Sequence, residues 1–462
     1  MLFTSILFYP VLALAAVAFY ATPSKGRVWY LLGISYAFYA FASHFYVVLL
    51  LVSTAITYWA GLAIAETEEE GRKQWIMAIN IAVIVGVLIV FKAAGVLHGI
   101  LLPLGISYYS FKLLAYVIEV YWNERSAIRE PREFFLYPVF FPQIVSGPIQ
   151  RPRDFFLQLQ TTVAQKADYD NIEHGFRLIL GGLLMKLLVA DRLSVFINLV
   201  DQSPEQYRWR IVVTTIVCYT LQLYADFSGY TNIALGIGKL FGINGPPNFN
   251  APFAAATIPQ MWQRWHMSLT SWVSDYLFSP INMSLRSFGK AGLFLAISIN
   301  MIVIGLWHGL TPNFLVFGIL HALYTIATIL TARWRERLFP KTKTFKAIRL
   351  LLGIVITFSL MTFSQIFWHT GTWAAAITHL KLFLRVTPAG TLQWDAIRTD
   401  AMEPVFACMC IAFYVGIGAP GMKWIGNGVN RFVPNWIQYG FYLLLISALT
   451  IESGASFVYG QF

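Results

Sequence analysis

Polar and ionisable side chains collect at four places inside otherwise apolar sequence. These places are residues 222–229 (QLYADFSG), residues 260–275 (QMWQRWHMSLTSWVSD), residues 305–313 (GLWHGLTPN) and His321 within the apolar run 314–330. His308 ends an apolar run, between Trp307 and Gly309. A neutral imidazole in such surroundings is well suited to take a proton from a hydroxyl group. His308 is therefore the first candidate for a general base.

Each of these polar residues also has a structural interpretation. For His308, a hydrogen bond that caps the end of a span explains the pattern equally well. His266 lies in a segment that could rest on a membrane surface, which slightly favours a structural role. His321 is expected to bond across helices, and Asp226 to serve as a packing or capping carboxylate. The other histidines lie near the ends of apolar runs, where histidine is ordinary: His44, His98, His174, His369 and His379.

The composition decides what kind of protein must position these groups. The chain has 462 residues, of which 57% are apolar, 16% aromatic and 12% charged. Soluble globular chains have roughly 25% charged residues, and soluble domains would need a charged surface that this chain lacks. The sequence therefore predicts an all-α polytopic membrane protein and excludes a disordered, collagen-like or nucleic-acid-binding chain. The net charge of +11 is typical of membrane proteins, which concentrate Lys and Arg in cytoplasmic loops.

A membrane-spanning helix needs about 20 mostly apolar residues. On that criterion, spans are expected near residues 2–20, 28–42, 45–65, 75–97, 100–122, 174–200, 209–225, 229–242, 291–308, 312–331, 348–369, 402–418 and 435–455. Several of these are short or contain Gly and Pro, so about eleven true spans and about two or three partial ones are predicted. The first is expected to be a retained span, not a signal peptide.

Two apolar segments are not expected to cross the membrane cleanly. Residues 134–147 carry Pro138 and Pro142, which predicts a re-entrant or interfacial element. Residues 257–280 mix tryptophans with charged residues, and this amphipathic pattern is typical of an interface or a cavity. No internal repeat is visible, so the sequence does not support an inverted-repeat transporter.

The basic segment 333–349 sets the expected orientation. It carries seven Lys and Arg residues against one acid, Glu336. Because positively charged loops stay in the cytoplasm, this segment is predicted to be a cytoplasmic loop between two spans.

Several catalytic and metal-binding motifs are absent from the sequence. It contains no HExxH, Walker A, GxSxG or CxxC motif, so metal and nucleotide-hydrolysis chemistry have no support. The three cysteines, Cys218, Cys408 and Cys410, lie in apolar runs, which predicts neither a disulfide framework nor a thiol nucleophile. No bound metal or cofactor is expected.

Seven short motifs follow one another in the order typical of one protein family. They are PLGISYY at residues 103–109, QIVSGPIQR at 143–151, QLYADFSGYTNIALGIG at 222–238, NFNAPF at 248–253, WQRWHMSLTSWVSDY at 262–276, INMIVIGLWHGLTPN at 299–313 and GILHA at 318–322. On these motifs the chain resembles the membrane-bound O-acyltransferase family, in its bacterial branch of alginate O-acetylation and teichoic-acid D-alanylation proteins. The RWH-x-SL and WHG motifs, whose histidines are forty-two positions apart, are specific as a pair.

The resemblance has limits along the chain. It covers a motif-bearing core of about residues 100–325, and no motif matches beyond about residue 335. Residues 277–286 read LFSPINMSLR, where many acetylating relatives carry a Gly-Gly-Asn-Arg stretch after Tyr-x-Pro-Leu. This departure weakens an assignment to alginate specifically.

The resemblance implies that residues 1–462 form one domain. In this domain, a ring of about eleven transmembrane helices, with re-entrant or interfacial helices, would surround a central tunnel. The resemblance also implies transfer of an acyl group from a thioester to a hydroxyl, with His308 as the essential histidine and His266 at a second, usually polar, position. His266 would hydrogen-bond the donor or the oxyanion, or orient His308.

The same resemblance implies the substrates and their routes. The donor would arrive from the cytoplasm, with acetyl-CoA as the first choice and a carrier-protein thioester as the second. The acceptor, a polysaccharide or an extracytoplasmic partner transferase, would arrive from outside. The protein would be integral to the bacterial cytoplasmic (inner) membrane and surrounded by its lipid.

Further motif residues are assigned to the tunnel or the substrates. Trp262, Trp265 and Trp307 are expected to line the tunnel, and anchoring at the membrane interface explains them about as well. Arg264 would attract donor phosphates or anchor the topology. The remaining residues assigned to substrate binding or the tunnel are Ser268, Asp226, Asn313 and His321.

The sequence leaves other functions open. A polysaccharide or lipid transporter could use His308 and Asp226 as a proton relay, although the missing repeats and the paired motifs count against it. A relay enzyme would hand the acyl group to a separate transferase outside the membrane. D-alanyl transfer from a carrier-protein thioester to a cell-envelope polymer would use the same motifs.

Overall fold

The computed structural model describes residues 2–99, 102–162, 166–338, 342–386, 390–392, 399–418 and 434–450. These residues are predominantly helical, and an isolated bridge joins Tyr207 to Leu392. The all-α class predicted from the sequence is therefore confirmed. The chain divides into two compact units, one within Met1–Gly182 and Tyr230–Pro247 and the other within Leu183–Gly229 and Asn248–Val458.

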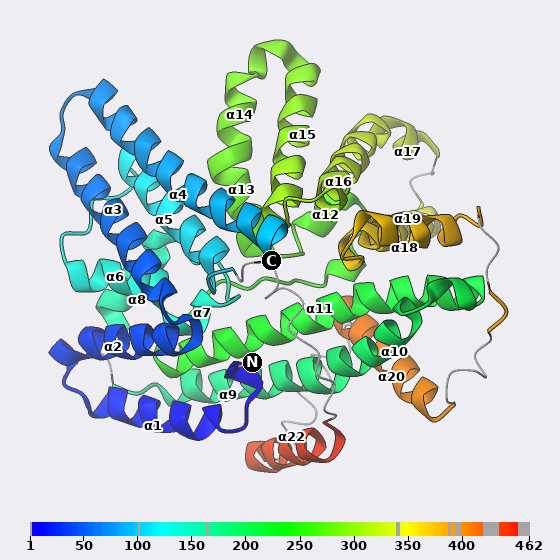
Figure 1. Cartoon of the computed structure of the whole chain (residues 1–462), viewed down its shortest axis with the longest axis horizontal. Helices are drawn as coiled ribbons and strands as arrows, with labels where there is room; N and C mark the ends of the chain where they lie inside the picture. The colour runs from blue at the N-terminus through cyan, green and yellow to red at the C-terminus, as the bar shows by residue number, and fades with distance from the viewer. Residues whose placement is uncertain are drawn as a thin grey trace. The chain divides into compact units, whose positions relative to one another are not determined.

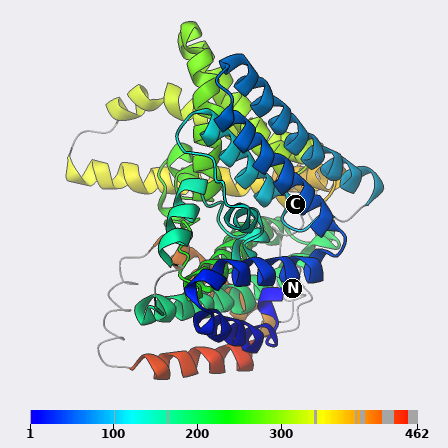
Figure 2. The ribbon, with the colours of Figure 1, turned by 90° about the vertical axis from the view of Figure 1, so that its left-hand side faces the viewer.

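The first unit is built mainly from the N-terminal helices (Figure 1). They are α1 (Phe8–Ala21), α2 (Ser24–Ser43), α3 (Tyr46–Glu66), α4 (Glu70–His98), α5 (Ile106–Tyr121), α6 (Pro131–Val139), α7 (Phe141–Ile144), α8 (Pro152–Thr162) and α9 (Tyr169–Leu183). Helix α5 is buried at every position from Ile106 to Val120. Helices α3 and α4 pack along it, and the three lie side by side in Figure 1 and Figure 2. An apolar helix covered on all sides in this way is a core helix of its unit.

Lys112 is the cation that this core helix carries. Its side chain is 1% exposed, and its Nζ donates to the carbonyl oxygen of Tyr137 at 3.1 Å and to Oε1 of Gln143 at 2.9 Å. These acceptors lie on α6 and α7, into which the chain breaks at Phe140. Helices of nine and four residues are too short to span a bilayer, in agreement with the prediction for residues 134–147.

The second unit contains most of the motif residues. Its helices are α10 (Asp191–Asp201), the first part of α11 (Trp209–Leu240), α12 (Ile258–Trp262), α13 (Met267–Val273), α14 (Ser279–Ser284), α15 (Gly289–His308), α16 (Pro312–Leu330), α17 (Ala332–Leu338), α18 (Lys343–His369), α19 (Trp373–Phe383), α20 (Thr399–Gly416) and α22 (Asn435–Leu449). Two π-helical turns, η2 (Leu184–Ala190) and η5 (Ser274–Phe278), interrupt it. The predicted amphipathic segment 257–280 is thus a series of short helices.

Helices α15 and α16 form a closely packed hairpin (Figure 1). A Cβ atom added at Gly305 would lie 2.3 Å from the carbonyl oxygen of Phe314, and one added at Gly318 would lie 2.7 Å from that of Met301. Small residues allow membrane helices to approach this closely. The contact brings the end of α15, where His308 lies, against the first turn of α16.

Six helices among the described residues are long and apolar enough to cross a membrane. They are α3, α4, α11, α15 with its preceding turn (Arg286–His308), α16 and α18. Shorter apolar helices cover Phe8–Ala21, Pro404–Gly416 and Ile437–Leu449. The chain is therefore a multi-pass helical protein, in line with the coarser part of the prediction.

The prediction of separate spans near residues 209–225 and 229–242 was wrong. Both belong to the single 32-residue helix α11. Ser228, Gly229 and Tyr230, which suggested a break, are helical and buried. A helix interior tolerates one glycine at a cost of about 1 kcal/mol, and burial of the flanking apolar turns outweighs this cost.

The prediction that residues 333–349 form a loop was also wrong in part. Residues up to Leu338 belong to α17 and residues from Lys343 belong to α18, while residues 339–341 lie outside the described residues. Arg, Lys, Leu and Ala are good helix formers, so a basic segment between apolar helices can itself be helical. The positive charge that sets the predicted orientation is unchanged.

A cysteine in this basic segment should be shielded from the outside of intact cells. In a background with the three native cysteines replaced, Glu336→Cys on α17 should resist a membrane-impermeant maleimide, because the seven basic residues of the segment predict a cytoplasmic location. Gly371→Cys, just beyond the opposite end of α18, is the matched control and should react. The reverse pattern of labelling would invert the orientation.

Candidate active site

His308 ends α15 inside an aromatic enclosure. The residue is 2% exposed. Its ring centroid lies 4.2 Å from that of Trp368, 4.4 Å from that of Trp307 and 6.2 Å from that of Phe314. A Cβ atom added at Gly309 would lie 2.4 Å from the ring of Phe314, so the glycine after the histidine allows α16 to approach. The imidazole is thus removed from bulk water.

His266 has a strained backbone at the start of α13. Its φ of 44° and ψ of 51° place it in the left-handed region, which costs a residue other than glycine about 1 kcal/mol. Asn248 holds this turn, because its carbonyl oxygen accepts from the backbone N–H of Met267 at 2.9 Å and its Oδ1 accepts from the hydroxyl of Ser268 at 2.6 Å. Strain that its surroundings maintain in this way is a recurrent feature of functional sites.

The His266 imidazole is buried and faces the same tryptophan as His308. The residue is 1% exposed, and its ring lies 4.7 Å from Phe227 and 6.3 Å from Trp307. His266 lies outside the six candidate spans, and burial lowers its pKa to about 3, which keeps the ring neutral at physiological pH. The two histidines that the sequence singled out therefore meet at Trp307.

Trp262 and His321 belong to one buried hydrogen-bonded chain. Trp262 Nε1 donates to Nδ1 of His321 at 3.2 Å, and Nε2 of His321 lies 3.0 Å from the hydroxyl of Ser364. Because that hydroxyl donates to the carbonyl oxygen of Met361, it accepts from Nε2, and His321 is neutral with its proton on Nε2. His321 thus bonds across from α16 to α12 and α18.

Asp226 takes part in a buried ion cluster that the sequence analysis missed. Nζ of Lys186 lies 2.8 Å from Oδ1 of Asp226 and 2.7 Å from Oδ1 of Asp191, and the three side chains are 8% exposed or less. The π-helical turn η2 brings Lys186 and Asp191 together, because the backbone N–H of Asp191 bonds to the carbonyl oxygen of Lys186. The five-residue spacing of Lys186 and Asp191 was the available signal in the sequence.

The remaining predicted site residues fall into structural contacts around this centre. Ser268 is bound to Asn248, as described, and Nη1 of Arg264 donates to the carbonyl oxygen of Ala251 at 3.3 Å. The ring of Trp265 lies 5.1 Å from that of Phe249. Nδ2 of Asn313 donates to the carbonyl oxygen of Thr370 at 2.8 Å. Trp368, which touches His308, was not predicted, because an isolated tryptophan near a span end gives no signal.

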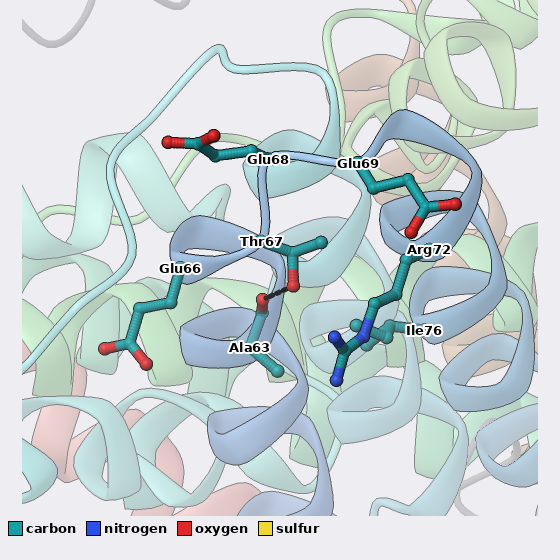
Figure 3. A pocket seen from close by; sticks show the side chains of 7 residues that line it. All are labelled: Ala63, Glu66, Thr67, Glu68, Glu69, Arg72 and Ile76. Carbon is teal, nitrogen blue, oxygen red and sulfur yellow. Dashed lines mark hydrogen bonds between the residues drawn. The ribbon is translucent and has the colours of Figure 1, made fainter.

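A surface pocket lies in the other unit, at the turn between α3 and α4 (Figure 3). Its volume is about 390 Å³, and it is lined by Ala63, Glu66, Thr67, Glu68, Glu69, Arg72 and Ile76. Glu66 is 64% exposed in its side chain and lies 3.9 Å from Arg129. The pocket is therefore lined by a solvated acidic turn and contains no histidine or other group suited to acyl transfer.

Comparison with known proteins identifies the family. The profile of the membrane-bound O-acyltransferase family matches residues 28–369. The chain belongs to this family. The matched region contains His266, His308 and Trp368, and membership in a family of O-acyltransferases argues against the transporter interpretation.

Three relatives illustrate the range of the family near this member. A probable alginate O-acetylase of Pseudomonas fluorescens is 30% identical over 316 residues, which cover 66% of this chain and 61% of that protein. A peptidoglycan O-acetyltransferase of Helicobacter pylori is 27% identical over 408 residues, 79% of this chain and 75% of that protein. A teichoic acid D-alanyltransferase of Bacillus subtilis is 30% identical over 285 residues, 58% of this chain and 68% of that protein. The match thus spans less than two thirds of the length of the alginate O-acetylase.

Lys186→Met should strongly lower the thermal unfolding temperature of the purified protein. The variant leaves the buried carboxylates of Asp191 and Asp226 without their cation, and breaking a buried pair from one side typically costs about 3–5 kcal/mol. Adding Asp226→Asn should recover part of the loss. Arg177→Met is the matched control, since it removes a 2.9 Å pair with Glu173 that is 39% exposed and worth about 0.5 kcal/mol. Equal unfolding temperatures for the two single variants would contradict the structural role of the cluster.

Proposed function

We propose that this protein is an acyltransferase that moves an acetyl group from acetyl-CoA to a hydroxyl of a cell-envelope polysaccharide, or to a partner transferase outside the membrane. The observation that carries this proposal is the buried imidazole of His308 between Trp307 and Trp368, in a chain of the O-acyltransferase family. A thioester already has a good leaving group, so a base for the incoming hydroxyl is the group the reaction most needs.

In the proposed reaction, His308 accepts the proton of the acceptor hydroxyl as its oxygen attacks the thioester carbonyl carbon. The tetrahedral intermediate then breaks its carbon–sulfur bond, and the proton passes from His308 to the leaving thiolate. His308 occupies the C-terminal end of α15, where the helix dipole stabilises the imidazolium by about 0.3–1 kcal/mol. The surrounding aromatic rings exclude water that would otherwise hydrolyse the donor.

His266 is proposed to assist by hydrogen bonding. A neutral imidazole can donate one hydrogen bond to the donor carbonyl or to the oxyanion that forms from it. The strained, fully buried backbone at His266 supports a positioning role for this ring. Asn248 would then act indirectly, by holding the turn.

The wider architecture belongs to the same proposal. We propose that residues 1–462 act as one acyltransferase in the bacterial inner membrane, with a ring of about eleven spanning helices around a tunnel. Trp262, Trp265 and Trp307 would line the tunnel and Arg264 would attract donor phosphates. The contacts of Ser268, Asp226, Asn313 and His321 with protein partners support a role in shaping the tunnel wall.

D-alanyl transfer from a carrier-protein thioester is the second candidate. The teichoic acid D-alanyltransferase of Bacillus subtilis is as similar in identity, 30%, as the alginate O-acetylase. The two candidates differ in the acyl group and in its carrier, while the proposed base and the exclusion of water are common to both.

Donor preference tests the proposal directly. Purified protein in detergent should release CoA from acetyl-CoA when a hydroxyl acceptor such as an oligosaccharide is added, and should discriminate against a D-alanyl carrier-protein thioester. Preference for the carrier-protein thioester would replace the first candidate with the second. Failure to use any thioester, by protein shown to be folded, would contradict both.

His308→Ala should abolish acyl transfer while the protein remains folded. Loss of a general base typically costs about 10²–10⁴-fold in rate, and the aromatic enclosure offers little water as a substitute. His266→Ala should impair transfer less, because positioning is more easily compensated than proton removal. His98→Ala, at an exposed position at the end of α4, is the matched control. Acylation and unfolding temperature are measured on the same preparations, and a well-folded His308→Ala protein with near-normal transfer would refute the mechanism.

A further inference from the structure

Three side chains outside the proposed reaction centre converge in the second unit. Asp201 is the last residue of α10, His369 is the last residue of α18, and His379 lies on α19. Nε2 of His369 lies 2.6 Å from Oδ2 of Asp201, and Nε2 of His379 lies 3.2 Å from Oδ1. One ligand atom from each residue lies within 4.8 Å of the others. Three separate helices thus direct two imidazoles onto one carboxylate.

The hydrogen-bond pattern of His379 requires a positive charge at this point. Its Nδ1 lies 3.0 Å from the carbonyl oxygen of Ala375, and a carbonyl only accepts, so Nδ1 carries a proton. In the neutral ring, Nε2 then presents a lone pair to the carboxylate of Asp201, which also only accepts. Two acceptors at 3.2 Å repel each other unless a proton or a metal cation lies between them.

His369 provides a second, independent observation. Its side chain is 6% exposed, and its Nε2 lies 2.6 Å from Oδ2 of Asp201. A buried ring nitrogen this close to a carboxylate oxygen is placed to share a cation with it, either a proton or a metal ion. Its ring is held from the other side by Tyr219, at 4.3 Å between centroids.

Two imidazoles and one carboxylate form a donor set that suits a divalent transition metal. Zinc accepts His nitrogen at about 2.0–2.1 Å and carboxylate oxygen at about 2.0–2.2 Å, usually in a tetrahedral site. Metal-bound histidines commonly donate their other ring N–H to a backbone carbonyl, as His379 does to Ala375. The cluster is most exposed at Asp201, whose side chain is 24% exposed, whereas that of His379 is 5% exposed. A metal ion could enter from this side, and a water molecule could bind there as the fourth ligand.

We propose that Asp201, His369 and His379 bind one divalent transition-metal ion of the zinc class. The ion replaces the repulsion between acceptor atoms by three coordinate bonds. It also ties the C-terminal end of α18 to α10 and α19. The residue before His369 is Trp368, whose ring contacts His308, so the metal holds one wall of the proposed active site in place.

A protonated His379 paired with Asp201 is the alternative occupant of the same geometry. Burial alone would lower the pKa of His379, but its hydrogen bonds to Asp201 and to the carbonyl of Ala375, together with the carboxylate charge, raise it above the ordinary value. This state needs no metal. The two occupants therefore differ in a measurable quantity, the metal content of the folded protein.

Metal content of the full chain tests the proposal without any measurement of acyl transfer. Protein in detergent is stripped with EDTA, equilibrated with micromolar Zn²⁺, desalted and analysed by elemental mass spectrometry. About one zinc ion per chain and a raised unfolding temperature are expected. His379→Gln and Asp201→Asn should reduce the zinc content to background, whereas His174→Gln, at an exposed position on α9, should retain it.

Cobalt gives a second readout that locates the ion. Co²⁺ added to the stripped wild-type protein should produce the visible absorption of a four-coordinate site, and Zn²⁺ should abolish that absorption. His379→Cys, which keeps a ligand at the position, should add a thiolate-to-cobalt band even if the other variants fail to fold. Wild-type protein that binds neither ion, or a cobalt spectrum that His379→Cys leaves unchanged, would overturn the proposal.

Discussion

In the second unit, one ammonium group lies between two carboxylates at a place almost closed to water. Lys186, Asp191 and Asp226 are each 8% exposed or less in their side chains, and neither lipid nor a packed interior can solvate a lone charge there. The pairing therefore fixes the rotation of α11 about its axis relative to the turn η2. Tyr219 and Phe227 lie on the same helix as Asp226. The ring centroid of Tyr219 lies 4.3 Å from that of His369, and the ring centroid of Phe227 lies 4.7 Å from that of His266. The positions of His266 and His369 thus depend on a charge pairing that contacts neither residue.

The proposed reaction centre obtains its properties from apolar contacts more than from polar ones. His308 is enclosed by the rings of Trp307, Phe314 and Trp368, and aromatic side chains supply a large, rigid wall at little entropic cost. A general base must be neutral before it accepts the proton of the hydroxyl. The left-handed backbone at His266 turns its ring toward Trp307, and Asn248 compensates the strain through two hydrogen bonds.

The sequence predicted the helical class and the family, because hydropathy and short motifs are local signals. The same motifs singled out His308 and His266, whose role in the reaction stays a prediction. The sequence did not reveal that α11 is one continuous helix, because a glycine such as Gly229 suggests a helix end as long as the burial of its neighbours is unknown. The helical character of residues 333–349 was also missed, because basic residues were interpreted by charge and not by propensity. Trp368, the pairing of Lys186 with Asp226, and the cluster of Asp201, His369 and His379 join residues far apart in sequence, and no local pattern could identify these contacts. His369 and His379 were accordingly interpreted as ordinary histidines at span ends.

The end of α18 shows why such distant pairings matter for one small site. Trp368 and His369 are the last two residues of α18, and Thr370 follows them in an extended conformation. The three residues contact different helices: Trp368 meets His308 on α15, His369 meets Asp201 on α10, and the carbonyl of Thr370 accepts from Asn313 on α16. A shift of this helix end would disturb its contacts with all three helices. A group that strengthens the contact at His369 would therefore also help to hold the tryptophan that encloses His308.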